Sequence, residues 1–121
     1  MNFKRILKLV DLAKTTDDGL RDCFELAQRF AAEVHLLHIV PPNSIPIFGN
    51  QKRLSQSAEK IRLLPIPDNS LRIIREVRDG AVVACLTNYV DEANIELLVL
   101  DRADVAGLGA RGANALVNEL R

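Results

Sequence analysis

The sequence has few of the residues that build metal centres and redox sites. Its 121 residues include only two cysteines, Cys23 and Cys85, and two histidines, His35 and His38. No CxxC pair and no cysteine–histidine cluster is present, so a zinc site is not expected. Both cysteines fall on apolar helical positions, which is typical of buried, unreactive thiols, and free thiols favour a reducing cytoplasm.

Net charge and long apolar runs are lacking too. Lys and Arg together number 16, and Asp and Glu together also number 16. The overall charge therefore gives no reason to expect nucleic acid or an anionic membrane as a partner. No apolar run approaches the roughly 20 residues of a membrane span, and the first residues, Met1 to Arg5, do not open an apolar leader. We expect a cytoplasmic protein that binds neither nucleic acid nor membrane.

Motifs of hydrolytic catalysis are also absent. The sequence contains no G-x-S-x-G, no H-E-x-x-H and no cysteine beside a plausible base. This pattern favours a protein that binds a ligand or a partner without transforming it, and we expect no enzymatic activity.

Hydrophobic residues make up 48% of the sequence. They occur by turns in short strand-like runs and at helical spacing. Short apolar runs predict strands at residues 3–10, 34–40, 71–77 and 95–100. Helical spacing predicts helices near residues 20–30, 51–64, 80–90 and 113–120, the first with an apolar stripe of Leu20, Cys23, Phe24, Ala27 and Phe30. Strands that alternate with helices predict one α/β domain over residues 1–121, with a parallel sheet covered by helices on both faces.

Ligands of open parallel sheets bind beyond the carboxyl ends of the strands. Four places meet that condition: Asp11, the loop that starts at Val40, Arg78-Asp79-Gly80, and the segment from Asp101 onward. In the last segment, Gly107, Gly109 and Gly112 fit the pattern GxGxxG between a strand and a helix, where main-chain N–H groups up to Ala113 and the charge of Arg111 can hold a phosphate. The alternative is a linking loop that caps the helix.

Four segments resemble the universal stress protein family. The stretch F-E-L-A-Q-R-F-A-A-E-V-H-L-L-H-I-V at 24–40 is similar to that family's first helix and second strand. I-L-K-L-V-D at 6–11 is similar to the first strand, I-I-R-E-V-R-D-G at 73–80 to the third strand, and N-I-E-L-L-V-L at 94–100 to the fourth. The resemblance implies a Rossmann-like fold of the adenine nucleotide alpha hydrolase kind, with strand order 3-2-1-4. It also implies that Asp11 occupies the acidic position beside the adenosine. The alternative is an aspartate that only ends the strand.

The ATP-binding motif of that family is degenerate here. Asp101 and Asp104 stand where the resemblance implies two glycines, and Ala113 lacks the hydroxyl of the closing Gly-Ser or Gly-Thr pair, although Gly107-Leu108 matches. Only seven residues separate Asp104 from Gly112, so the spacer is two residues shorter than the family's. Two carboxylates would repel a triphosphate unless a metal bridged them. ATP or another adenine nucleotide is thus possible as a ligand, but ATP binding is expected to be weak or absent.

The resemblance implies a non-catalytic regulatory domain of the stress response. The alternatives are a nucleotide-dependent α/β enzyme or ATP-binding module that uses the loop from Gly107 to Gly112, and an interaction domain that has lost its nucleotide. The family's fifth strand is missing, so the strand at 95–100 becomes an apolar edge that invites pairing. We therefore expect a homodimer, a piece of a longer chain, or a protein partner; a loop that covers the edge is the alternative.

Four residues in or beside the predicted elements need a structural explanation. His35 and His38 point to opposite faces of one strand and are interpreted as structural histidines. Lys8 interrupts a buried strand and must extend to solvent or find a partner. Ala31 stands where the family often has glycine, so a left-handed backbone there would cost on the order of 1 kcal/mol.

Overall fold

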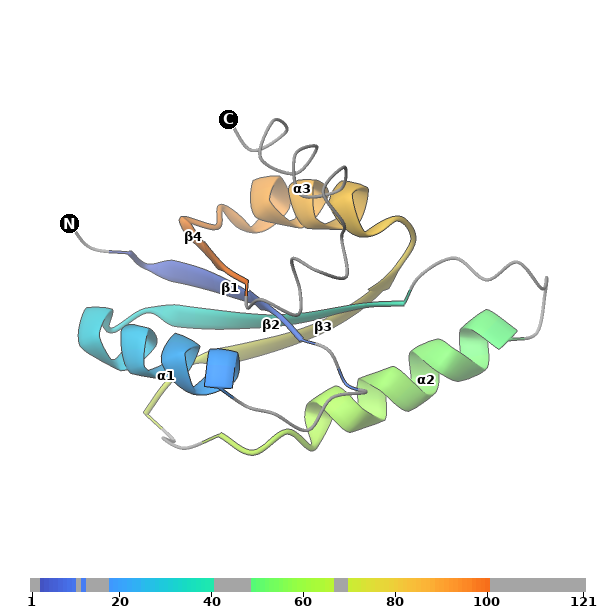
Figure 1. The fold of residues 1–121 in the computed structure, drawn as a ribbon, viewed down its shortest axis with the longest axis horizontal. Coiled ribbons are helices and arrows are strands. Elements are labelled where there is room, and N and C mark those ends of the chain that lie inside the picture. Colours follow the sequence, from blue (N-terminus) through green and yellow to red (C-terminus); the bar gives the residue numbers. More distant parts are fainter. Residues whose placement is uncertain (1–2, 11, 13–17, 41–48, 67–69, 101–121) are drawn as a thin grey trace.

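The described part of the chain folds into four strands and three helices in strict alternation (Figure 1). The computed structural model describes residues 3–10, 12, 18–40, 49–66 and 70–100. The strands are β1 (Arg5–Leu9), β2 (Glu33–Val40), β3 (Ile73–Asp79) and β4 (Leu97–Val99), and the helices are α1 (Asp18–Phe30), α2 (Gly49–Arg62) and α3 (Val82–Ala93). The predicted helix over 113–120 lies outside the described residues.

All strand pairs are parallel, and the order across the sheet is β3-β2-β1-β4, as predicted. β1 pairs with β2 from Arg5↔Glu33 to Leu9↔Leu37, and with β4 from Ile6↔Leu97 to Lys8↔Val99. Helices α1 and α2 cover one face and α3 covers the other (Figure 1). The predicted α/β class, strand order and two-sided helical cover are therefore confirmed.

The sheet divides the hydrophobic core into two clusters because successive strand residues point to opposite faces. Ile6, Val34 and Leu36 pack under α1 and α2 with the predicted α1 stripe, in which Cys23, Phe24 and Ala27 are buried. Leu7, Leu9, Leu37 and Ile39 pack on the other face against Leu86 and Tyr89 of α3. The inner strands β1 and β2 thus contribute to both clusters.

The outer strands differ from their predicted bounds. β3 runs to Asp79, two residues beyond the predicted end, because Ile39 and Val40 of β2 continue the pairing with Arg78 and Asp79. The helix predicted to open at Gly80 begins at Val82. β4 keeps only Leu97–Val99 of the predicted 95–100, since the register pairs only three of its residues with β1.

Lys8 and Ala31 show how two unfavourable residues are accommodated. The Lys8 side chain is only 4% exposed, and its ammonium donates a 2.7 Å hydrogen bond to the carbonyl of Leu9. It finds a partner inside the protein and does not extend to solvent. Ala31 follows α1 with φ 53°, so this position does have a left-handed backbone, at a cost of about 1 kcal/mol relative to glycine.

Candidate functional site

The candidate site is the edge of the sheet at which the parallel strands end. Of the residues predicted to bind a cofactor, the structure describes only Val40, the last residue of β2. Asp11, Gly107, Gly109, Arg111, Gly112 and Ala113 lie outside the described residues, as do Asp101 and Asp104. What the structure places at this edge is therefore the main chain around Val10, Val40, Asp79 and Gly80.

Val40 and Gly80 are joined through their main chains. The N–H of Gly80 donates to the carbonyl of Val40 at 3.0 Å, so the turn after β3 lies directly against the end of β2. The Val40 side chain is only 2% exposed, which leaves its main chain as the part that can meet a ligand. Gly80 adopts φ +133°, and a Cβ there would lie 3.2 Å from Cys85 Sγ. This thiol, half-buried rather than buried as predicted, donates to the carbonyl of Asp79 at 3.4 Å.

The end of β1 is fixed by side chains as well as by the sheet. Nδ1 of His38 donates to the carbonyl of Val10 at 2.8 Å, and the N–H of Val10 donates to the carbonyl of Leu37 at 2.8 Å. Because the His38 bond requires a proton on Nδ1, the neutral ring leaves Nε2 as an acceptor. His38 thus has a structural role, as predicted, and it positions the backbone where the first strand ends.

The surroundings of both thiols disfavour the thiolate form. Burial raises the pKa of Cys23 to about 11, against the opposing effect of the Lys8 ammonium. Burial also raises the pKa of Cys85, with Arg78 acting in the opposite direction. Reactive cysteines need a lowered pKa, so the prediction of unreactive thiols is supported by the surroundings of both residues.

A polar network that is buried at His35 and Tyr89 and exposed at Arg72 joins β2 to α3. His35 Nε2 donates to Glu33 at 2.7 Å, its Nδ1 lies 2.6 Å from the Tyr89 hydroxyl, and Glu33 pairs with Arg72 at 3.2 Å. The Arg78 guanidinium stacks 4.9 Å from the centre of the Tyr89 ring. His35 is confirmed as structural. Its link to Tyr89 was not predicted, and the only sequence signal was a tyrosine on an otherwise apolar helical stripe.

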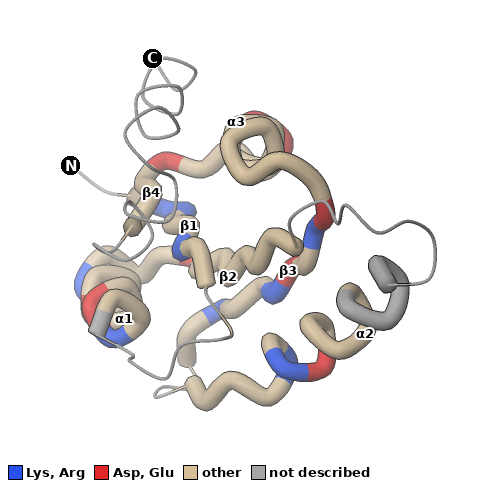
Figure 2. Tube along the Cα trace, turned by 45° about the vertical axis from the view of Figure 1, so that its right-hand side comes forward, with Lys and Arg blue, Asp and Glu red and all other residues tan. Residues whose placement is uncertain are grey.

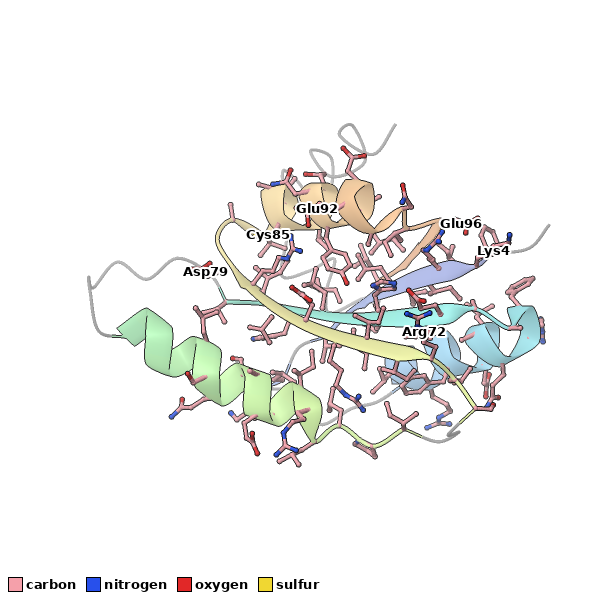
Figure 3. All side chains as sticks on the ribbon, turned by 180° about the vertical axis from the view of Figure 1, so that it is seen from behind. Lys4, Arg72, Asp79, Cys85, Glu92 and Glu96 are labelled. Carbon is pink, nitrogen blue, oxygen red and sulfur yellow. The ribbon has the colours of Figure 1, made fainter. Side chains whose placement is uncertain are left out.

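Other possible sites lie elsewhere on the molecule. A cavity of about 620 Å³ opens at the amino ends of the strands, with Lys4, Arg5, Glu33 and Arg72 in its wall. Figure 3 shows Lys4, Arg72 and Glu96 at that end, far from Asp79 and Cys85 at the opposite end.

Within the described ranges, no group of three or more metal-ligating side chains comes together. No helix in the described part of the chain is long and apolar enough to span a membrane.

Comparison with solved structures finds the same architecture. Universal stress protein UspA from Lactobacillus plantarum has a TM-score of 0.65 at 15% identity, over 98% of this chain and 93% of that one. A universal stress protein in complex with cAMP gives 0.62 at 15% identity, over 98% and 91%. The universal stress protein from Archaeoglobus fulgidus in complex with dAMP gives 0.59 at 16% identity, over 98% and 92%.

Comparison by sequence was made with curated proteins and with family models. No curated protein matches the chain. The model of the universal stress protein family, however, matches residues 2–111, which is nearly the whole sequence. Together with a parallel sheet in the order β3-β2-β1-β4, this match shows that the chain belongs to the universal stress protein family.

Proposed function

We propose that this domain is a cytoplasmic, non-catalytic regulatory module of the stress response that binds an adenine nucleotide at the carboxyl edge of its sheet. The observation that carries the proposal is the junction of β2 and β3, where Gly80 N–H meets the Val40 carbonyl at the strand ends. Ligands of parallel sheets bind at this edge. Two structurally similar proteins were solved with adenine nucleotides, cAMP and dAMP.

The preferred ligand has one phosphate rather than three. Asp101 and Asp104 replace the glycines of the family's ATP motif, and the spacer to Gly112 is short. A carboxylate about 8 Å from a phosphate charge repels it by roughly 2 kcal/mol at an effective dielectric constant near 20. A triphosphate carries more negative charge than a monophosphate, so ATP is penalised most.

Catalysis is not part of the proposal. Hydrolysis or group transfer needs an activated nucleophile or a free general base. Both cysteines have raised pKa values, and both histidines are held by hydrogen bonds that position the backbone or a buried network. These features support a domain that reports the presence of a nucleotide and leaves it unchanged.

Isothermal titration calorimetry with AMP, cAMP, ADP and ATP, with and without magnesium, tests the ligand. We expect ATP to bind with a dissociation constant well above 1 μM, and the double substitution D101G/D104G to tighten ATP at least about tenfold, equivalent to roughly 1.4 kcal/mol. AMP affinity should change less, because less phosphate charge approaches the two positions. Submicromolar ATP binding by the unaltered chain, or an unchanged ATP affinity in the double variant, would contradict the assignment.

The domain is further proposed to act as a homodimer or as part of a larger assembly. β4 is the outer strand of the described sheet, and Leu97, Leu98 and Val99 are apolar and half-buried. Charge along an edge strand opposes pairing with an identical strand of a second copy, and Leu97–Val99 carry none. The β4 edge therefore favours pairing with the β4 edge of a second copy.

Light scattering across a concentration range measures the assembly. We expect a mass near twice the 13.4 kDa of the chain, with the fraction of dimer rising with concentration. A monomer at the highest concentration, with the amides of β4 protected from hydrogen exchange, would show that this edge is covered within one chain.

A further inference from the structure

A groove of about 590 Å³ separates α2 from the outer strand β3. Its walls include Leu54, Ala58 and Ile61 from α2, and Arg75, Glu76 and Val77 from β3. Arg75 and Val77 point to the α2 face of the sheet, and Glu76 lies between them in the wall of the groove. Figure 2 shows charged residues gathered along β3 and on the last turns of α2 beside it.

Arg75 is the residue in this groove that lacks a suitable partner. Its Nε is buried and has no hydrogen-bond partner, and its Nη2 donates only a long bond of 3.5 Å to the carbonyl of Leu64. Three other arginines of the described chain, Arg62, Arg72 and Arg78, each pair with a glutamate. A buried N–H without an acceptor is costly, and a carboxylate that accepts from a guanidinium forms one of the stronger protein hydrogen bonds.

The main chain of β3 presents its outward-facing groups beside Arg75. The N–H of Val34 bonds to the carbonyl of Arg72, and the N–H of Gly80 bonds to the carbonyl of Val40, at the two ends of the β2–β3 pair. In a parallel pair the main-chain groups of alternate residues face the partner strand. Those of Arg75 and Val77 therefore face outward, from the outer edge of the described sheet.

We propose that this groove binds an extended peptide segment of a partner protein that carries an aspartate or glutamate. The segment pairs with the outward main-chain groups of Arg75 and Val77, as in other peptides that add a strand to a sheet edge. The acidic side chain opposite Arg75 accepts from the guanidinium, because side chains paired across neighbouring strands lie about 5 Å apart. An apolar side chain two residues away falls on the same face and meets Leu54, Ala58 and Ile61.

The charges of β3 make the groove selective. An apolar strand that paired with this edge would gain the main-chain hydrogen bonds but would leave the Arg75 guanidinium without an acceptor, so it would bind less well than an acidic one. An acidic segment satisfies the guanidinium and the main chain together. A small carboxylate satisfies the guanidinium but not the main chain, so a peptide is the better occupant.

A random heptapeptide library displayed on phage and selected against the immobilised full chain tests the proposal. Selected peptides should carry Asp or Glu at one position, flanked by β-branched or aromatic residues. The same selection on Arg75→Met should lose the acidic position, whereas Arg62→Met, which removes an exposed charge on the rim of the same groove, should keep it. Circular dichroism and thermal melting of each variant show that the fold is retained.

The most enriched peptide is then measured by fluorescence anisotropy. Replacing its acidic residue with the matching amide should weaken binding at least about tenfold, and a backbone N-methyl group at the neighbouring residue should do the same. An acidic consensus that persists on Arg75→Met, or no consensus at all, would overturn the proposal. Full competition by millimolar free glutamate, with no effect of N-methylation, would instead identify a small-carboxylate site and rule out strand addition.

Discussion

Gly80→Ala is expected to lower the free energy of unfolding by about 2–3 kcal/mol. Gly80 adopts φ +133°, a backbone conformation that residues with a Cβ rarely enter, at a cost of roughly 1–3 kcal/mol. The added methyl group also lies 3.2 Å from Cys85 Sγ, so α3 or the turn must shift. Because Gly80 N–H holds the Val40 carbonyl, the shift would disturb the candidate nucleotide site as well.

Urea denaturation followed by circular dichroism measures this loss. Gly19→Ala is the matched control, since Gly19 lies in α1 and alanine is the better helix former there. The double variant that combines Gly80→Ala with Cys85→Ala separates the cost of the backbone conformation from the cost of the contact with Cys85 Sγ. Removing the sulfur should restore only the part that comes from the close contact, and most of the loss should remain. If Gly80→Ala changed stability by less than about 0.5 kcal/mol, the conformation of this turn would have to be different.

Tyr89 in the folded protein is expected to ionise near pH 12, instead of near pH 10 as in an unfolded chain. Burial raises the pKa of Tyr89 to about 12, with Glu76 acting in the same direction and Arg78 against it. The hydrogen bond to His35 adds a reason: with Nε2–H donating to Glu33, the neutral ring accepts the Tyr89 proton at Nδ1. The sequence contains one tyrosine and no tryptophan, so absorbance at 295 nm reports this single group.

The same shift predicts how stability depends on pH. A group whose folded pKa is raised contributes stability that is complete below its unfolded pKa and disappears as pH rises through the folded value. For Tyr89 the contribution is complete below about pH 10 and is lost by about pH 12, and two pKa steps correspond to about 2–3 kcal/mol. Tyr89→Phe should lack this alkaline loss but cost about 1–3 kcal/mol at neutral pH, because His35 Nδ1 loses its partner. A folded-state midpoint near pH 10 would contradict both expectations.

The sequence predicted the sheet well because the signal for it is local. The two inner strands are mostly apolar on both faces despite Lys8 and the two histidines, and the α1 stripe of Cys23, Phe24 and Ala27 has the helical period. Strand ends were less predictable. β3 continues to Asp79 because its neighbour β2 offers further pairing positions, and no property of Arg78 or Asp79 alone indicates that.

The position of Val40 at a strand end was predictable, but the contacts around it were not. The rule that ligands meet the carboxyl ends of parallel strands selected Val40, which lies there. The contact of His35 with Tyr89 and the unsatisfied Nε of Arg75 depend on residues far apart in sequence or on the packing of one helix against one strand. These contacts are set by tertiary packing, which the local sequence does not determine.

The position of β2 between two separate clusters has a consequence for how this protein can change over evolutionary time. Its successive residues belong to opposite sides, with Val34 and Leu36 under α1 and α2, and Leu37 and Ile39 under α3. Side chains on opposite faces share no partners, so the energetic effects of altering them should add independently. Each side of the sheet can therefore accumulate substitutions without compensation from the other, and a lineage can remodel the groove beside α2 while the packing beneath α3 stays intact.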